Sequence, residues 1–131
     1  MNPNTQADLG KLILRIALGV LILLHGVAKL KGGVSGIVGM VEAQGLPGWL
    51  GYGVLIGEVL APVMVLIGAY ARIGGIIIAI NMLVAIWLAH MGQLGQFNEQ
   101  GGWALELQGM FLAGALGVAL LGPGSYSANN K

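Results

Sequence analysis

Hydrophobic residues are grouped along this chain into four long runs, which short polar segments separate. The runs cover about residues 12–30, 50–69, 73–91 and 103–121. Each run is close to the roughly 20 residues that a helix needs to cross the hydrocarbon core of a bilayer. The third run is the most apolar, because its stretch IGGIIIAINMLVAIWLA carries no charged side chain. The pattern therefore predicts four transmembrane helices.

The segments between the runs predict the connections. Residues 32–48 read GGVSGIVGMVEAQGLPG, in which glycine recurs too often for a spanning helix. The apolar residues of this segment can face lipid while Glu42 and Gln44 face water, which predicts a short interfacial helix in the membrane plane. We expect a tight turn at residues 70–72 and a polar loop at residues 92–102. Together these elements predict an all-α protein, an antiparallel bundle of four transmembrane helices.

Composition supports lipid as the main surroundings of the chain. The 131 residues are 56% hydrophobic and only 8% charged, whereas soluble domains carry about 25% charged residues. The net charge of +1 provides no basic field for nucleic acid. The absence of cysteine excludes disulfides, thiolate chemistry and Cys-ligated iron–sulfur clusters. We therefore expect residues 1–131 to form one membrane domain, whose partner is the lipid bilayer and not a nucleic acid.

Cationic residues near the ends of the spans predict the orientation in the membrane. They divide four against two between the two ends of the bundle: Lys11, Arg15, Arg72 and Lys131 against Lys29 and Lys31. Because an excess of lysine and arginine marks the cytoplasmic side, we expect both termini in the cytoplasm. On this interpretation Arg15 and Arg72 are structural residues that anchor the topology.

Five ionisable side chains are predicted to meet at one depth in the outer half of the bilayer. They come from all four spans: His25, Lys29, Glu58, His90 and Glu106. Glu58 lies roughly 12 Å inside the second span, at about 1.5 Å per residue. Charged groups within spans are costly in free energy and normally face the interior of the bundle. The sequence therefore predicts a polar cluster inside the bundle.

Small residues indicate which helix faces turn inward, because they allow neighbouring helices to approach closely. Gly26 lies in the stripe of the first span that carries Lys29, with His25 at the edge of that stripe. In the fourth span, Glu106 shares a face with Gly117. These faces predict that all three ionisable side chains point toward the other helices.

The second and third spans add two expectations. His90 aligns with Gly75 on one face of the third span, and Asn81 is expected to point elsewhere. Pro62 follows Glu58 by four residues, and proline has no N–H to donate to the carbonyl four residues earlier. The backbone carbonyl of Glu58 is therefore predicted to lack its α-helical donor, which makes Pro62 a structural residue of this site.

Each candidate also has a purely structural interpretation. Lys29 can snorkel to the membrane surface, and His90 can be an interfacial residue at a helix end. Glu106 lies one turn into its span and can face the water of the headgroup region. Glu58 lies so deep that its carboxylate needs a partner or a proton, and a pair with Lys29 or His25 can serve only to hold helices together.

The residues also resemble those of a known family, the DoxX family of small four-helix membrane proteins, over about residues 12–127. The first span carries the pattern of the family as Arg15, Gly19, Leu24, His25, Gly26, Lys29 and Leu30. Further matches follow along the chain at Gly45-Leu46-Pro47, Glu58, Gly68, Arg72, Met82, His90, Gly101-Gly102 and Gly122-Pro123-Gly124 with Ser125-Tyr126-Ser127. The family takes its name from a subunit associated with thiosulfate:quinone oxidoreduction, and relatives are linked to oxidative-stress membrane complexes. The resemblance thus implies a protein of the bacterial inner (plasma) membrane.

Two functions follow as hypotheses. In the first, the chain is an oxidoreductase-associated subunit that holds a quinone or quinol head group between its helices. Glu58 and His25 would exchange protons, Lys29 would polarise a carbonyl oxygen, and His90 and Glu106 would help to bind the ligand. In the second, the chain is a membrane adaptor without catalysis, which anchors a soluble redox enzyme through residues 32–49 and 92–102.

No intrinsic cofactor and no metal site are predicted. The chain shows no flavin or metal motif, so a soluble redox partner protein would have to supply electrons. Haem between His25 and His90 is a minor alternative, because two lone histidines are weak evidence for a haem site. A carrier function is another, and it would require a homo-oligomer, since four spans rarely form a pathway alone.

Overall fold

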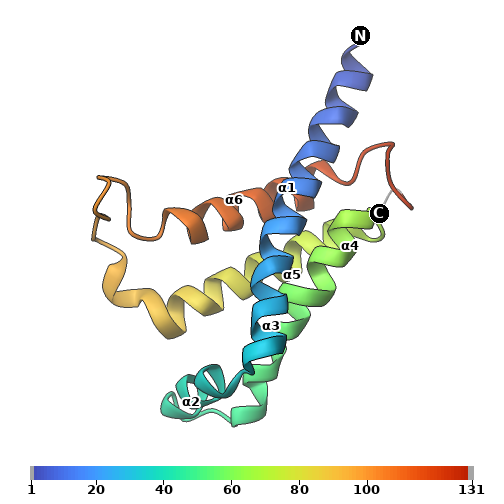
Figure 1. The fold of residues 1–131 in the computed structure, drawn as a ribbon. Helices are drawn as coiled ribbons and strands as arrows, with labels where there is room; N and C mark the ends of the chain where they lie inside the picture. Colours follow the sequence, from blue (N-terminus) through green and yellow to red (C-terminus); the bar gives the residue numbers. More distant parts are fainter. Residues whose placement is uncertain (1, 130–131) are drawn as a thin grey trace.

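The computed structural model describes residues 2–129, which are helical throughout apart from connecting turns and loops. Within this part of the chain the one β-type contact is an isolated bridge between Phe97 and Trp103. Figure 1 shows the order of the helices along the chain. They are α1 (Pro3–Gly32), α2 (Ser35–Ala43), η1 (Gly48–Tyr52), α3 (Gly53–Leu55), η2 (Ile56–Leu60), α4 (Ala61–Ile67), α5 (Ala71–Ala85), η3 (Ile86–His90), η4 (Met91–Gln93) and α6 (Glu106–Leu121).

Three of the four predicted spans are present as continuous helical segments that are long and apolar enough to cross a membrane: Pro3–Gly32, Gly48–Ile67 and Ala71–Gln93. The fourth, α6, has 16 residues, which cover about 24 Å at about 1.5 Å per residue. This is less than the roughly 30 Å of a bilayer core. The helix begins at Glu106 and not near Trp103, so a fourth full crossing stays a prediction.

The surface of the helices supports an integral membrane protein. Large apolar side chains that point away from the core are numerous, among them Leu24, Met110 and Leu120. A water-soluble monomer rarely exposes contiguous apolar surface on this scale. Lipid is the environment in which such a surface is stable.

Helix α1 begins nine residues before the expected span because its N-terminus is well capped. The side chain of Asn2 accepts a hydrogen bond from the backbone N–H of Thr5 at 2.8 Å, and Pro3 occupies the first turn. Asparagine as the cap and proline in the first turn both favour a helix start. The extra turns are polar and lie outside the apolar run.

The second span is not a uniform α-helix. Residues Ile56–Leu60 form a π-helical turn, and the N–H of Ala61 donates to the carbonyl of Ile56, five residues earlier. Pro62 follows in the first turn of α4 and cannot donate to the carbonyl of Glu58. A π-helical turn of this kind is frequent at functional sites, and here it contains Glu58.

The long helices form two hairpins that cross each other. Helices α5 and α6 lie side by side, and in Figure 1 this pair crosses α1 and α4 at a wide angle. The core lies at the crossing, where Ile22 of α1, Val65 of α4, Ile78 of α5 and Ala115 of α6 are buried together. Consecutive long helices run in opposite directions, but a bundle with all four helices aligned is not confirmed. The position of α2 in a membrane interface also stays a prediction.

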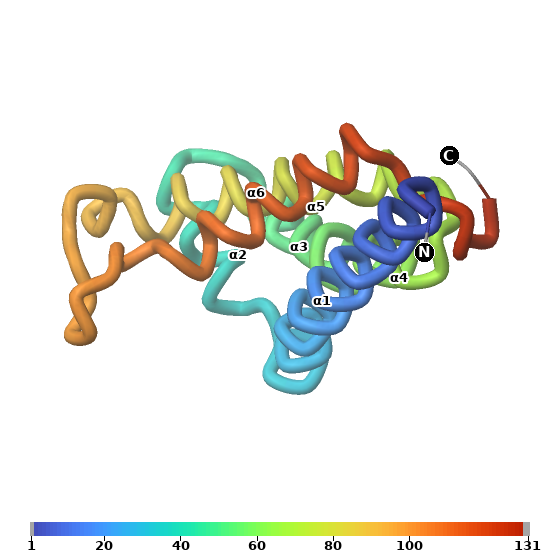
Figure 2. Tube along the Cα trace, turned by 90° about the horizontal axis from the view of Figure 1, so that it is seen from above, coloured from blue at the N-terminus to red at the C-terminus, as the bar shows by residue number. Residues whose placement is uncertain are grey.

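The start of α1 and the segment after α6 lie at the same end of the molecule, opposite the loop before α6 (Figure 2). The segment after α6 folds back over the ends of α1 and α4. The N–H of Ala128 donates to the carbonyl of Ile67 at 3.0 Å, and the hydroxyl of Ser125 donates to the carboxylate of Asp8 at 2.7 Å. Both described chain ends therefore belong to one end of the molecule.

Candidate functional site

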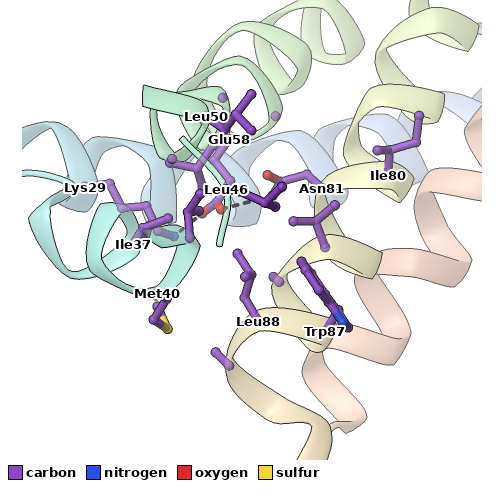
Figure 3. Close-up of a pocket in the computed structure, with 18 of the residues that line it drawn as sticks. Lys29, Ile37, Met40, Leu46, Leu50, Glu58, Ile80, Asn81, Trp87 and Leu88 are labelled. Atoms are coloured by element: carbon purple, nitrogen blue, oxygen red, sulfur yellow. Dashed lines mark hydrogen bonds and ion pairs between the residues drawn. The ribbon is translucent and has the colours of Figure 1, made fainter. Parts of the chain in front are cut away.

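A cluster of three polar side chains lies where α1, η2 and α5 meet. Glu58 is only 4% exposed. One of its carboxylate oxygens, Oε1, forms an ion pair with Nζ of Lys29, and the other, Oε2, accepts a hydrogen bond from Nδ2 of Asn81 at 3.0 Å. Figure 3 shows these contacts as dashed lines at the centre of a pocket. Glu58 was predicted to contact Lys29 or His25, and the structure shows the contact with Lys29.

Two glycines allow the three helices to approach closely enough for these contacts. A Cβ atom at Gly26 would overlap the backbone carbonyl oxygen of Glu58, and one at Gly57 would overlap the side chain of Asn81. The carbonyl that has no α-helical donor because of Pro62 thus faces Gly26 of α1. Only glycine permits this backbone-to-backbone approach, because any other residue carries a Cβ atom.

Asn81 was expected to point away from the polar cluster, and that expectation is wrong. Helix α5 has two inward faces and not one, since it packs against η2 as well as α6. Gly75 lies against the backbone of Ala115 in α6, whereas Asn81 faces Glu58 across Gly57. The sequence held a signal for this contact, because Gly57 immediately precedes Glu58 and an asparagine within a spanning helix requires a partner.

A cavity of about 710 Å³ opens beside the three polar residues. Its walls come from α2, η1, α3 and η2 on one side and from α5 and η3 on the other. Most of the lining is apolar, including Ile37, Leu50 and Trp87, and the ionisable groups in the lining are Lys29, Glu58 and His90. Asn81 adds an amide. An apolar cavity with a few convergent polar groups is the usual form of a small-molecule site.

His25 and His90 lie near Glu58 but do not form hydrogen bonds with it in the described structure. The ring of His25 packs edge-on against Phe111, with ring centroids 5.7 Å apart. Nδ1 of His90 lies 2.8 Å from Oε1 of Gln93. Both histidines, together with Glu58, line a second cavity of about 160 Å³. The structure therefore brings the two histidines to the polar cluster without bonding them to it.

Glu106 is not part of this cluster, so the prediction of one connected group that includes it is wrong. It is the first residue of α6, it is exposed, and its Oε1 accepts a hydrogen bond from Nδ2 of Asn98 at 2.8 Å. Because the helix begins three residues later than expected, the side chain turns back toward the loop. Glu106 lines neither cavity, and its contact serves to close that loop.

Both arginines bond to backbone carbonyls, and Arg15 is buried within the protein; their role as topology anchors stays a prediction. Arg15 is 1% exposed and donates hydrogen bonds to four backbone carbonyls: those of Val65 at 2.9 Å, Leu66 at 3.0 Å, Pro123 at 3.0 Å and Tyr126 at 2.8 Å. Arg72 is exposed and donates to the carbonyls of Ala119 and Leu120 at the end of α6. Arg15 thus ties the end of α4 to the C-terminal segment.

Comparisons with known proteins identify the family of this chain. The sequence model of the DoxX family matches residues 10–91, which contain His25, Lys29, Glu58, Asn81 and His90. A protein of Bacillus subtilis (strain 168) named "Putative oxidoreductase CatD" is 27% identical over 110 residues, which cover 84% of this chain and 81% of that relative. No solved structure matches the chain. Because the family match covers more than half of the sequence, this chain belongs to the DoxX family.

Proposed function

We propose that this protein is a membrane subunit of a redox complex and that its larger cavity binds the head group of a quinone or quinol. The observation that carries the proposal is the cavity of about 710 Å³, in which apolar walls surround the ion pair of Lys29 and Glu58. A quinone has the matching chemistry, because an apolar ring and tail carry two carbonyl oxygens that accept hydrogen bonds and, on reduction, protons.

The polar side chains have donors left for such a ligand. The ammonium group of Lys29 has three N–H donors, and its one partner among the described residues is Glu58. The amide of Asn81 has two N–H donors, of which one is used by Glu58. We assign Lys29 and Asn81 as hydrogen-bond donors to a quinone oxygen and His90 to a second hydrogen bond with the quinone. Glu58 and His25 are assigned to proton exchange.

The electrons would come from a soluble redox partner. The chain has no cysteine, and among the described residues no group of three or more His, Cys, Asp or Glu residues is arranged to hold a metal ion. The proposal of a redox role draws on the name of the Bacillus relative, which calls that protein an oxidoreductase. The name says nothing of quinones, so the ligand rests on the cavity alone.

A non-catalytic adaptor is the second candidate. The observation in its favour is an exposed aromatic side chain in the loop before α6. Phe97 is 76% exposed, and it lies outside the apolar helices that would face lipid. Such a side chain can anchor a soluble enzyme at the membrane. In that case the pair of Lys29 and Glu58 would serve only to hold α1 against η2.

Ligand analysis of the purified protein tests the proposal directly. We expect organic extraction and mass spectrometry to recover a quinone, and added short-chain quinone to bind to the delipidated protein with a change in its absorbance spectrum. Absence of quinone from the extract together with no binding of added quinone would contradict the proposal. Capture of a soluble redox protein under those conditions would favour the adaptor.

The variant Glu58→Gln separates proton exchange from scaffolding. Glutamine keeps the shape and can still accept hydrogen bonds, but it cannot form a carboxylate that takes up a proton. We expect quinone-dependent turnover and spectral change to be lost while the melting temperature in detergent falls only modestly. A purely structural pair predicts the opposite: the melting temperature falls because Lys29, whose side chain is 28% exposed, loses its partner, while the protein that stays folded keeps its quinone-dependent turnover.

Glu106→Gln provides the matched control for this variant. It makes the same chemical change in a carboxylate that also accepts a hydrogen bond from an asparagine, but it lies outside both cavities. Quinone binding and turnover should equal those of the wild-type protein. Equal effects of the two substitutions would mean that the cavity is not the site.

A further inference from the structure

The smaller cavity shares a wall with the larger one. Lys29, Glu58 and His90 line both cavities, so the buried carboxylate lies between them. On the far side, the smaller cavity is bounded by Phe111 and Gln108 of α6. The smaller cavity therefore reaches Glu58 from a second side, the side that faces α6.

The smaller cavity lies beside the polar end of α6. Gln108 is in the first turn of that helix, two residues after Glu106, which is exposed and bonded to Asn98 of the preceding loop. His25, which lines the same cavity, is also exposed. The cavity thus lies between His25 and Gln108, on the side near the start of α6, and the Glu58 carboxylate, which is 4% exposed.

The contents of this cavity follow from its size and its lining. Its volume of about 160 Å³ is well above the roughly 10–15 Å³ that one water molecule requires. A buried water also needs two to four polar partners, and the lining offers His25, His90, Gln108 and the pair of Lys29 and Glu58. Apolar residues such as Ile22, Leu107 and Phe111 form the rest of the lining. The polar groups favour water in this cavity, whereas a cavity with a purely apolar lining stays dry.

We propose that the smaller cavity is a water-filled path by which protons reach Glu58 from the loop end of the molecule, and that Gln108 holds water in it. The path serves the quinone site proposed above and rests on that function. When a bound quinone takes two electrons from a redox partner, it also needs two protons. Each proton passes from cavity water to a carboxylate oxygen of Glu58 and on to a quinone oxygen. A proton from the aqueous side then neutralises the hydroxide left in the cavity.

Radiolytic footprinting of the full-length protein in detergent tests whether the cavity is wet. Short X-ray pulses convert bound water to hydroxyl radicals, which oxidise the adjacent side chains. We expect Met82, which lines the smaller cavity and is 6% exposed, to be oxidised severalfold faster than Met64, which lines neither cavity. In water labelled with oxygen-18, the oxygen added to Met82 should carry the label. Oxidation of Met82 no faster than that of Met64 would overturn the proposal.

A matched pair of variants tests the assignment of Gln108. Gln108→Leu keeps the size of the side chain but removes the groups that hold water, whereas Gln96→Leu makes the same change in the loop, outside both cavities. We expect severalfold slower oxidation of Met82 in Gln108→Leu and no change in Gln96→Leu. Equal oxidation in both variants would contradict the role of Gln108.

Reduction of bound quinone by dithionite tests whether protons use the path. Dithionite supplies the two electrons and is oxidised to sulfite, while the two protons come from water. We expect Gln108→Leu to slow quinol formation severalfold and to leave the Kd for quinone unchanged, since Gln108 does not line the larger cavity. An unchanged rate would overturn the proton path.

The outcomes separate this proposal from the proposed function. If the protein binds no quinone but Met82 is still oxidised rapidly, the quinone function fails and the hydrated cavity stands. If quinone binds and Met82 is protected, the water path fails and the quinone site stands.

Discussion

Two charged side chains of residues 2–129, Arg15 and Glu58, are buried in this fold, and each is satisfied by polar partners. Arg15 is the clearest example, because it is almost fully buried and has no carboxylate partner within the described residues. Its guanidinium group is instead surrounded by backbone carbonyls from α4 and from the C-terminal segment. The planar fork of arginine suits this arrangement, since it presents five N–H donors in fixed directions.

Arg15→Met should therefore loosen one end of the molecule. Methionine has a similar length but no donors, so four hydrogen bonds to backbone carbonyls are lost. Loss of a buried hydrogen-bond network of this kind costs about 3 kcal/mol. We expect a lower melting temperature in detergent and faster proteolysis within residues 123–129, which Arg15 holds in place.

Lys31→Met is the control for that substitution. It removes a cation from the same helix, but Lys31 is exposed and has no hydrogen bond in the described structure. Its melting temperature and proteolysis should match those of the wild-type protein. If Arg15→Met behaved in the same way, Arg15 would have no structural role.

Asn81→Leu should weaken quinone binding without abolishing it. The substitution removes the N–H donor that we assign to the quinone oxygen, together with the hydrogen bond to Glu58, but leaves the ion pair with Lys29. A hydrogen bond of this kind contributes roughly 0.5–1.5 kcal/mol, which corresponds to a loss of affinity of about two- to tenfold. The Kd of added quinone measures the effect.

The variant Asn98→Leu tests whether the loss of quinone affinity in Asn81→Leu is specific to the cavity. It breaks the other contact between an asparagine and a glutamate, which lies in the loop before α6. The Kd for quinone should not change, although the loop becomes less ordered. A similar loss of affinity in both variants would mean that it reflects general destabilisation.

At the scale of helices, the close approach of α1 to η2 positions the ion pair. Gly26→Ala should disrupt it, because the added Cβ would overlap the carbonyl oxygen of Glu58 and α1 would have to move away. Overpacking of this kind costs typically 1–3 kcal/mol. We expect both a lower melting temperature and loss of quinone binding, since the distance between Lys29 and Glu58 increases.

Gly10→Ala is the matched control on the same helix. A Cβ atom at Gly10 meets nothing within 4 Å, and alanine favours a helix over glycine by roughly 0.5–1 kcal/mol. The melting temperature should stay the same or rise slightly. A decrease in melting temperature comparable with that of Gly26→Ala would show that the loss of glycine itself, and not the close contact with Glu58, lowers the stability.

Helix periodicity and depth predicted most of the elements and part of the site. Lys29 and Glu58 could be placed together because antiparallel helices bring them to a similar depth, where a carboxylate needs a partner. The start of α6 could not be predicted from hydropathy, since Trp103 and Ala104 are as apolar as the helix that follows. Asn81 was missed because a single inward face was assumed for a helix that packs on two sides.

At the scale of the whole molecule, the described residues give the chain two chemically different ends. One end holds the start of α1, the turn before α5 and the segment after α6, which Arg15 and Arg72 connect. The other end holds α2, the cavities and the loop before α6 (Figures 1 and 2). This polarity implies that a ligand or partner that approaches the cavities does so from the side opposite the termini.

Which end faces the cytoplasm is a separate prediction, and the structure changes the count of cations that supports it. Arg15 is buried within the protein and Lys29 is partly buried and paired with Glu58, so neither is an exposed flanking charge. Among the described residues, Lys11 and Arg72 then remain at the end with the termini and Lys31 at the other. Lys131, which the sequence-based prediction also counted, lies outside the described residues. The excess still favours termini in the cytoplasm.

Cysteine labelling can test this orientation without background, because the chain has no cysteine. Asn4→Cys places a thiol near the N-terminus, and Glu99→Cys places one in the exposed loop before α6. An impermeant maleimide added to intact cells should react with the thiol at position 99, and it should reach position 4 only in inverted vesicles. The reverse pattern would place the termini outside and the cavities toward the cytoplasm. In that case the proton path to Glu58 would open to the cytoplasm, and a soluble redox partner would have to dock on that side.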